Sequence, residues 1–180
     1  MKGATMKVTM ERLNRTRDDI EVVAVLARMQ RHLRKLAEVA SVETLRGVEG
    51  ACGADYWPAL GRLAAGTAAP FRRQRPAHDP LNAAINYLTA LLSRDTRAAV
   101  LAAGLHPGFG FLHRPRDRAE PCVYDLMEPF RAPLSEGLAA HLFNARRLRP
   151  DMFANDEEGM RISPEGRRAL LRGDAADGFP

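Results

Sequence analysis

Four ionisable side chains that lie far apart in the chain are the candidates for chemistry: Glu49, His113, Asp125 and Glu128. Glu49 interrupts a stripe of apolar residues that has helical spacing. A carboxylate on such a face needs a partner, a proton or a metal ion, because an uncompensated charge is costly to desolvate. A salt bridge to one of the many arginines is the simpler interpretation of Glu49 taken alone.

Asp125 and Glu128 are three residues apart, so both side chains face one way on a helix. The same spacing fits a capping box, in which Asp125 caps the helix and Glu128 bonds back to its backbone. His113 lies close to aromatic residues and can be a purely structural histidine. Carboxylates and one imidazole can together bind a divalent ion, and such ligands suit Mg²⁺ or Mn²⁺.

Motifs for other chemistries are absent or weak. Cys52 and Cys122 do not form a CxxC pair, so support for a zinc site is weak, and we expect both to pack as small apolar residues. No P-loop, dinucleotide-binding GxGxxG or GxSxG nucleophile motif occurs. A carboxylate–imidazole centre is therefore the main chemical candidate.

Positive charge is modest in total but unevenly placed. The chain has 27 Lys and Arg against 22 Asp and Glu, a net charge of +5 and a pI of about 9.8. Arginines gather in three short runs, which are Arg72, Arg73 and Arg75; Arg114, Arg116 and Arg118; and Arg146, Arg147 and Arg149. Such runs can neutralise nucleic-acid phosphates, and an ordinary solvated surface is the alternative.

The elements that position these groups are expected to be helices. Alanine, leucine and arginine dominate the 180 residues, and the alternation typical of β-strands is scarce, so we expect an all-α fold. The predicted helices cover residues 18–40, 41–60, 79–92, 95–103, a stretch that begins near residue 125, 135–147 and 164–171. Residues 64–78 and 105–120 are expected to be loops, and one short strand is expected at Met6–Met10.

Caps and glycines refine the second predicted helix and the third. Ser41 and Asp79 are the predicted N-caps, and a proline follows Asp79 at the first helical position. Gly47, Gly50 and Gly53 lie inside the helix that Ser41 caps, and each costs about 1 kcal/mol relative to alanine. Such glycines need a reason, such as the close approach of another backbone or of a ligand.

The length suits one domain, and 46% hydrophobic residues suffice for a core. We expect a short N-terminal segment at 1–17, a helical domain at 18–172 and a flexible tail at 173–180. No stretch of 18 apolar residues and no export signal occurs, so we expect a cytoplasmic protein that does not enter a membrane. Two cysteines cannot form a disulfide framework, which agrees with a reducing compartment.

Four segments, taken in order, carry a resemblance to a known family. They are Leu45–Gly50 (LRGVEG), Arg73–Asn82 (RQRPAHDPLN), Gly104–His113 (GLHPGFGFLH) and Asp125–Arg131 (DLMEPFR), and Ile162–Arg167 (ISPEGR) follows them. The set resembles the CRISPR-associated integrase family, the subunit that inserts new spacers into CRISPR arrays. The resemblance covers roughly residues 42–171 and implies the helical catalytic domain of that family.

The resemblance implies a metal site made by Glu49, His113 and Glu128, with Asp125 as a further catalytic ligand or as a support for one. The implied cofactor is Mg²⁺ or Mn²⁺. Asn82 matches a family asparagine and is a structural or substrate-side candidate. The arginines that become candidate DNA contacts are Arg72, Arg73, Arg75, Arg114 and Arg116.

The implied function is that of a metal-dependent DNA endonuclease and integrase, which joins DNA 3′-hydroxyl ends to a CRISPR repeat by transesterification. The expected partners are double-stranded DNA, further copies of the chain and the small second core protein of CRISPR adaptation. Two alternatives are a non-catalytic DNA-binding scaffold and a helical interaction module whose arginines only confer solubility.

The chain also departs from the family pattern. Pro129 stands where the family usually has an acid, and Asp117-Arg118 where it often has Tyr-Gly. Residues 1–17 cannot supply the N-terminal β domain that mediates dimerisation in the family, so we expect most or all of that domain to be lacking. These departures spare the expected metal ligands.

Overall fold

The structure is a computed structural model that describes residues 2–67, 70–113 and 119–176, with side chains described as far as Arg172. The α-helices are α1 (Lys2–Arg17), α2 (Ile20–Arg34), α3 (Val42–Leu63), α4 (Pro80–Ala102), α5 (Pro121–Arg131), α6 (Leu138–Asn144) and α7 (Pro164–Ala176). The candidate DNA contacts Arg114 and Arg116 lie outside the described residues.

Short segments accompany these helices. Two 3₁₀ turns, η1 (Lys35–Glu38) and η3 (Pro150–Met152), and a π-helical segment, η2 (Ala132–Gly137), lie between them. The strands β1 (Phe153–Asp156) and β2 (Gly159–Ile162) form an antiparallel hairpin. The predicted all-α fold is confirmed, and the hairpin is the β structure that the sequence patterns missed.

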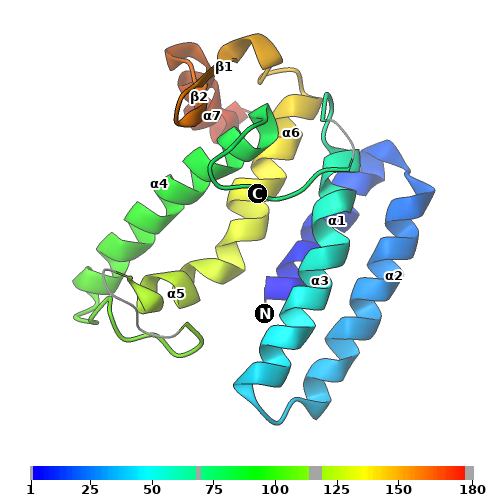
Figure 1. The fold of residues 1–180 in the computed structure, drawn as a ribbon, viewed down its shortest axis with the longest axis vertical. Coiled ribbons are helices and arrows are strands. Elements are labelled where there is room, and N and C mark those ends of the chain that lie inside the picture. Colours follow the sequence, from blue (N-terminus) through cyan, green and yellow to red (C-terminus); the bar gives the residue numbers. More distant parts are fainter. Residues whose placement is uncertain (1, 68–69, 114–118, 177–180) are drawn as a thin grey trace.

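The helices form two groups around the start of α1. Figure 1 shows α2 and α3 side by side, with α4, α5 and α6 across the molecule and the N-terminal end of α1 between the two groups. The segment η2 contacts α1, α4, α5 and α6, so it lies where the groups meet. None of the described helices is long and apolar enough to cross a membrane.

The predicted strand at Met6–Met10 is wrong, because these residues lie inside α1. Met6, Met10 and Leu13 are spaced four and three residues apart and are all buried, which is the pattern of one helix face. Contacts with α2, α3 and η2 cover α1, so tertiary burial outweighs the β-propensity of the intervening valine and threonine. From Lys2 on, the supposed separate N-terminal segment belongs to the packed helices.

Both predicted N-caps are confirmed. The Ser41 hydroxyl accepts a hydrogen bond of 3.1 Å from the Thr44 backbone N–H at the start of α3. The Asp79 carboxylate accepts one of 2.8 Å from the Asn82 backbone N–H at the start of α4. Each cap satisfies a backbone N–H that has no partner within its helix. The caps thus fix where the two longest helices begin.

Three predicted boundaries differ from the structure. The helices expected at 79–92 and 95–103 are one helix, α4, since neither proline nor glycine interrupts it after Pro80. α5 begins at Pro121, so Asp125 lies in its second turn and the capping-box interpretation is wrong. α7 runs to Ala176, past residue 173, where the predicted tail begins.

Two apolar clusters form the interior. The larger one draws on α1 to α4, α6 and α7 and contains Cys52, which packs there as a buried free thiol. The smaller one is separate and consists of Val100, Val123 and Met127, with Leu92 and Cys122 against it. Consequently α5 rests largely on its own cluster, while α3 belongs to the main core.

Candidate metal centre and nucleic-acid clefts

One ammonium group brings two of the expected ligands together. The Nζ atom of Lys2 lies 3.0 Å from Glu49 Oε1 and 3.2 Å from Glu128 Oε2. Glu49 comes from α3, Glu128 from α5 and Lys2 from the first turn of α1. The packing of these three helices therefore brings the three side chains together. Among the described residues, the ion-pair partner of Glu49 is a lysine rather than one of the arginines considered for it.

The carboxylate of Glu128 is held on one side and incompletely satisfied on the other. Arg131 Nη1 donates a hydrogen bond of 2.6 Å to Glu128 Oε1. The residue is only 8% exposed, and its Oε2 atom receives no hydrogen bond of good geometry although the Lys2 ammonium is near. A buried oxygen in this state has capacity for a cation.

Asp125 holds the loop that carries His113. Its Oδ1 atom lies 2.6 Å from His113 Nδ1 and accepts a 3.1 Å hydrogen bond from the His113 backbone N–H. Its Oδ2 atom accepts backbone hydrogen bonds from Leu112, at 2.8 Å, and from Phe111. Both oxygens are used on the loop, so the geometry places Asp125 as a support for His113.

The charge of Asp125 determines which ring nitrogen of His113 carries the hydrogen in their contact. Partial burial tends to raise the pKa of Asp125, but the hydrogen bonds from the imidazole and the backbone outweigh it, and the pKa is lower than usual. The ionised carboxylate can only accept, so Nδ1 of His113 carries the proton. In the neutral ring Nε2 then presents a lone pair, which is how metal-binding histidines are commonly held.

The candidate ligand atoms are of the kinds that a hard divalent cation prefers, although the side chains are not arranged around such an ion in this structure. Within the described ranges, no group of three His, Cys, Asp or Glu side chains is arranged to hold a metal ion. Nevertheless Glu49 and Glu128 already share one positive charge. Two carboxylates and one imidazole suit Mn²⁺ or Mg²⁺, and the Lys2 ammonium marks the position that a cation would take.

Two clefts adjoin this centre, and His113 lines both of them. The first, which we call the arginine cleft, has a volume of about 550 Å³. Its other polar lining residues are Arg75, Asn86, Thr89, Ser93, Tyr124, Glu128 and Arg131. Among the described residues Arg75 forms no ion pair, and burial together with the charge of Arg131 lowers its pKa. Within the described part of the chain, the buried hydroxyl of Thr89 has no hydrogen-bond partner.

The second cleft, the glycine groove, has a volume of about 540 Å³ and runs along α3. Its lining residues include Lys2, Arg46, Glu49, Gly50, Gly53 and Trp57. A Cβ atom built on Gly47 or Gly50 would meet nothing within 4 Å among the described residues. Within the described part of the chain, close approach of another segment therefore does not explain these two glycines.

Asn82 and Arg73 hold the loop before α4. Asn82 is completely buried, and its amide nitrogen donates to the Arg72 carbonyl and to the Asp79 carboxylate. Arg73 donates to the side-chain oxygens of Asn82, at 2.9 Å, and of Asn86, at 2.5 Å. Burial and the neighbouring arginines lower the pKa of Arg73 to about 10, so it stays charged at neutral pH. In this structure both side chains stabilise the loop, and a substrate-side role for Asn82 stays a prediction.

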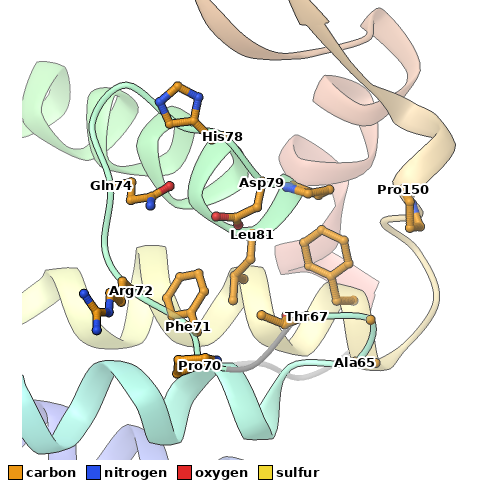
Figure 2. Close-up of a pocket in the computed structure, with 13 residues that line it drawn as sticks. Ala65, Thr67, Pro70, Phe71, Arg72, Gln74, His78, Asp79, Leu81 and Pro150 are labelled. Atoms are coloured by element: carbon orange, nitrogen blue, oxygen red, sulfur yellow. The ribbon is translucent and has the colours of Figure 1, made fainter.

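Arg72 lies on the other side of this loop from the arginine cleft's residues, at a third cavity of about 340 Å³. Figure 2 shows Arg72, Gln74 and His78 on the loop around this cavity, together with Phe71 and with Leu81 from the start of α4. Neither Glu49, His113 nor Glu128 lines this cavity. The three arginines of the run 72–75 therefore have three different environments, and only Arg75 faces the arginine cleft.

Comparison with known protein families shows to which family the chain that carries this centre belongs. The family model described as "CRISPR associated protein Cas1" matches residues 1–173. The chain belongs to the Cas1 family. The match includes all four candidate residues of the centre and both clefts, so the resemblance that four segments indicated is confirmed.

Curated Cas1 relatives share the sequence over part of their length. The CRISPR-associated endonuclease Cas1 1 of Thermus thermophilus is 39% identical over 127 residues, which are 71% of this chain and 40% of that protein. The CRISPR-associated endonuclease Cas1 2 of Rhodospirillum rubrum is 37% identical over 131 residues, 70% of this chain and 38% of that protein. The chain thus spans about two fifths of the Cas1 proteins that it matches here.

Solved structures share the fold. A Cas1 protein from Thermotoga maritima has a TM-score of 0.76 at 20% identity, over 96% of this chain and 54% of its own. A casposase bound to an integration product has a TM-score of 0.75 at 23% identity, over 96% and 48%. The helical arrangement described above is therefore a Cas1 fold, and it also occurs in a casposase bound to an integration product.

The sequence analysis did not predict the two positively charged side chains of this centre, Lys2 and Arg131. Lys2 belongs to no motif, and its role depends on where α1 packs. Arg131 stands inside a quoted family segment, and its spacing of three residues from Glu128 is a signal for a helical ion pair that could have been used. The buried Glu136 beyond Arg131 gives no sequence signal.

Proposed function

We propose that the chain is the catalytic part of a Cas1 integrase, which joins DNA 3′-hydroxyl ends to a CRISPR repeat in a metal-dependent reaction. The observation that carries this proposal is the convergence of Glu49 and Glu128 on one positive charge, between two clefts that His113 lines. The curated relatives are named endonucleases, and the casposase neighbour is bound to an integration product, which supports chemistry on DNA.

Each residue of the centre has a distinct task in this proposal. Glu49, Glu128 and the Nε2 atom of His113 would hold the ion, and Asp125 would orient the ring. A bound Mg²⁺ or Mn²⁺ supplies Lewis-acid polarisation of the phosphate and lowers the pKa of the attacking hydroxyl. Arg131 keeps Glu128 Oε1 occupied by a 2.6 Å hydrogen bond, which leaves Oε2 for the ion.

The reaction exchanges one phosphodiester for another. The 3′-oxygen of an incoming DNA end attacks a phosphorus of the repeat and forms a new P–O bond. The bond from that phosphorus to the repeat's own 3′-oxygen breaks, and the proton lost by the attacking hydroxyl balances the one gained by the released hydroxyl. With water as the nucleophile, the same steps give endonuclease activity.

The two clefts offer room for DNA on either side of the centre. Arg75 and Arg131 line the arginine cleft, whereas Lys2 and Arg46 line the glycine groove. Contacts with phosphates make binding salt-sensitive and largely independent of sequence. Two solved neighbours, at TM-scores of 0.83 and 0.77, come from Cas6-RT-Cas1–Cas2 complexes, so we also propose Cas2 and further Cas1 copies as partners.

The test is strand transfer of labelled duplex DNA into a CRISPR repeat with Mn²⁺ or Mg²⁺. Glu49→Gln, His113→Asn and Glu128→Gln should each lower joining at least 100-fold, as expected when a group that acts on the transition state is removed. Glu158→Gln is the control, because that carboxylate lies on the exposed hairpin turn, where it pairs with Arg161. Activity that survives Glu49→Gln and His113→Asn would exclude this centre.

A non-catalytic DNA-binding scaffold is the rival, and one observation favours it. The described ligand side chains are not gathered into a three-ligand metal site, and a lysine occupies the shared position. Salt-dependent duplex binding by the wild-type chain, with neither joining nor cleavage in the presence of either metal, would select this rival. Absence of DNA binding would favour the interaction module instead.

A further inference from the structure

Glu136 is a fully buried carboxyl group for which the proposed reaction has no direct use. It is 0% exposed, and neither of its oxygens receives a hydrogen bond of good geometry. Burial raises the pKa of Glu136, and the positive charge of Arg131 opposes that shift. The hydroxyl of Tyr56, also fully buried, faces it, and Glu136 contributes to raising the pKa of Tyr56. A buried carboxyl is costly, so its place calls for an explanation.

Arg131 connects Glu136 to the candidate metal centre. Its Nη2 atom lies 3.8 Å from Glu136 Oε1, and its Nη1 atom donates a 2.6 Å hydrogen bond to Glu128 Oε1. Beyond Glu128 follow Lys2 and Glu49. The charges alternate in sign along this series from the core to the clefts, with Glu136 at its inner end.

The π-helical segment η2 makes this series possible. Arg131 and Glu136 are five residues apart, and in a regular α-helix a separation of five residues turns side chains about 140° away from each other. A π-turn has i→i+5 geometry, so it brings residues at that spacing to one side. η2 begins directly after Arg131 and contains Glu136. The departure from α-helical geometry therefore serves to place this carboxyl behind the arginine.

The two carboxylates compete for one guanidinium. A guanidinium is planar and can serve one acceptor from each of its terminal nitrogens. Without Glu136, the whole charge of Arg131 would be drawn to Glu128, and it would oppose a metal ion at the other oxygen.

We propose that Glu136 is a positioning residue, which holds Arg131 so that Glu128 turns its Oε2 atom toward the cation. This inference rests on the proposed function, because the cation is taken to be the catalytic metal. Glu136 does not touch DNA or metal. It acts through Arg131 alone.

The test measures Mn²⁺ affinity of the full chain by calorimetry and by electron paramagnetic resonance. Glu136→Gln keeps the shape and removes the charge, and we expect a Kd about tenfold higher, at the lower end of what loss of an outer support costs. Glu136→Asp should recover part of the affinity because it restores the charge. Ser135→Ala, at a buried hydroxyl in the same turn that has no hydrogen-bond partner, is the matched control and should leave the Kd unchanged.

A double-mutant cycle separates positioning from general packing. In an Arg131→Met background, Glu136→Gln should have no further effect on Mn²⁺ affinity, because the residue it acts through is gone. Thermal unfolding checks that each variant folds, and Glu136→Asp carries the comparison if the glutamine variant does not.

The outcomes distinguish the two claims. Equal Mn²⁺ affinity in wild type and Glu136→Gln, or fully additive effects in the cycle, would overturn the role of Glu136 while Glu49→Gln still weakens binding. Mn²⁺ binding that is indifferent to Glu49→Gln and Glu128→Gln would instead overturn the proposed metal centre, and this inference with it.

Discussion

The Nδ1 atom of His113 donates its hydrogen to the Oδ1 atom of Asp125 across 2.6 Å. This contact joins the loop before α5 to α5 itself, since the same carboxylate also accepts backbone hydrogen bonds from Leu112 and His113. It fixes the orientation of the ring and leaves Nε2 for a ligand. One carboxylate thus holds both the shape of the loop and the orientation of the imidazole.

Asp125→Asn should weaken metal binding and should lower the stability of the fold at neutral pH but not in acid. The pKa of Asp125 is lowered in the folded state, so its stabilising effect is present above the unfolded value and is lost as the pH falls through the folded one. Wild type should therefore be more stable than Asp125→Asn at pH 7, by about 1–3 kcal/mol for hydrogen bonds to a charged group. The difference should shrink as the pH falls through the lowered pKa of Asp125 and disappear once that carboxyl is protonated in the folded protein as well.

Urea unfolding across this pH range measures the effect, and Asp95→Asn is its control. Asp95 is an exposed aspartate that pairs only with its neighbour Arg94 among the described contacts. A difference between wild type and Asp125→Asn that persists at the acid end would show that the charge of Asp125 is not its source.

Lys2→Met should raise Mn²⁺ affinity. The Lys2 ammonium lies between Glu49 and Glu128, so a metal ion has to displace it. We expect the Kd to fall about tenfold, equivalent to about 1.4 kcal/mol. In the absence of metal the same variant should be less stable, because the two carboxylates lose their common partner.

Lys7→Met is the matched control for this prediction. Lys7 lies on the same helix but pairs with Glu11. Calorimetric titration that shows unchanged or weaker Mn²⁺ binding by Lys2→Met would contradict a shared cation position.

Arg75→Gln should mainly change DNA binding, whereas Arg73→Gln should mainly change the stability of the fold. Arg75 lines the arginine cleft without an ion pair among the described residues, so its loss should lower DNA affinity and reduce the slope of log K against log salt by about one. Arg73 is tied to Asn82 and Asn86, so its loss should cost about 1–3 kcal/mol of unfolding free energy. Fluorescence anisotropy across a salt series, together with thermal melts, distinguishes the two. An unchanged salt slope in Arg75→Gln would remove it from the DNA contacts.

Gly61→Ala and Gly47→Ala should change stability in opposite directions. A Cβ atom on Gly61 would lie 2.1 Å from the Cβ atom of Phe71, which anchors the loop between α3 and α4. Displacing that buried ring should cost about 1–3 kcal/mol. A Cβ atom on Gly47 meets nothing, so alanine there should stabilise α3 by about 0.5–1 kcal/mol. Chemical denaturation measures both, and a neutral Gly61→Ala would show that the loop yields freely.

Local signals predicted much of the fold. The caps Ser41 and Asp79 and the stripe in α2 depend on residues three or four apart, and such patterns are legible without tertiary information. The strand predicted at Met6–Met10 is a part of α1, whose burial against α2, α3 and η2 is not visible in a local pattern. The sequence patterns predict that a helix ends before Asp95, but α4 continues through this exposed aspartate.

The sequence indicated the acids and the histidine of the candidate site, but it did not indicate the lysine and the arginine that pair with those acids. Glu49, His113 and Glu128 are carried by family segments, whereas the place of Lys2 follows from the packing of α1 between α3 and α5. An α-helix starting at Ser135, as predicted, would not bring Glu136 behind Arg131. Only the π-helical geometry of η2 does so.

The separateness of the two apolar clusters bears on how the centre stays assembled. Glu49 stands on a helix of the main core, while Asp125 and Glu128 flank Met127, which belongs to the small cluster. Keeping these acids together thus depends on the contacts of α1, α4 and η2 with α5, which join the two clusters. Under the proposed function, DNA in both clefts would contact both sides of this junction and would favour the arrangement in which the acids converge.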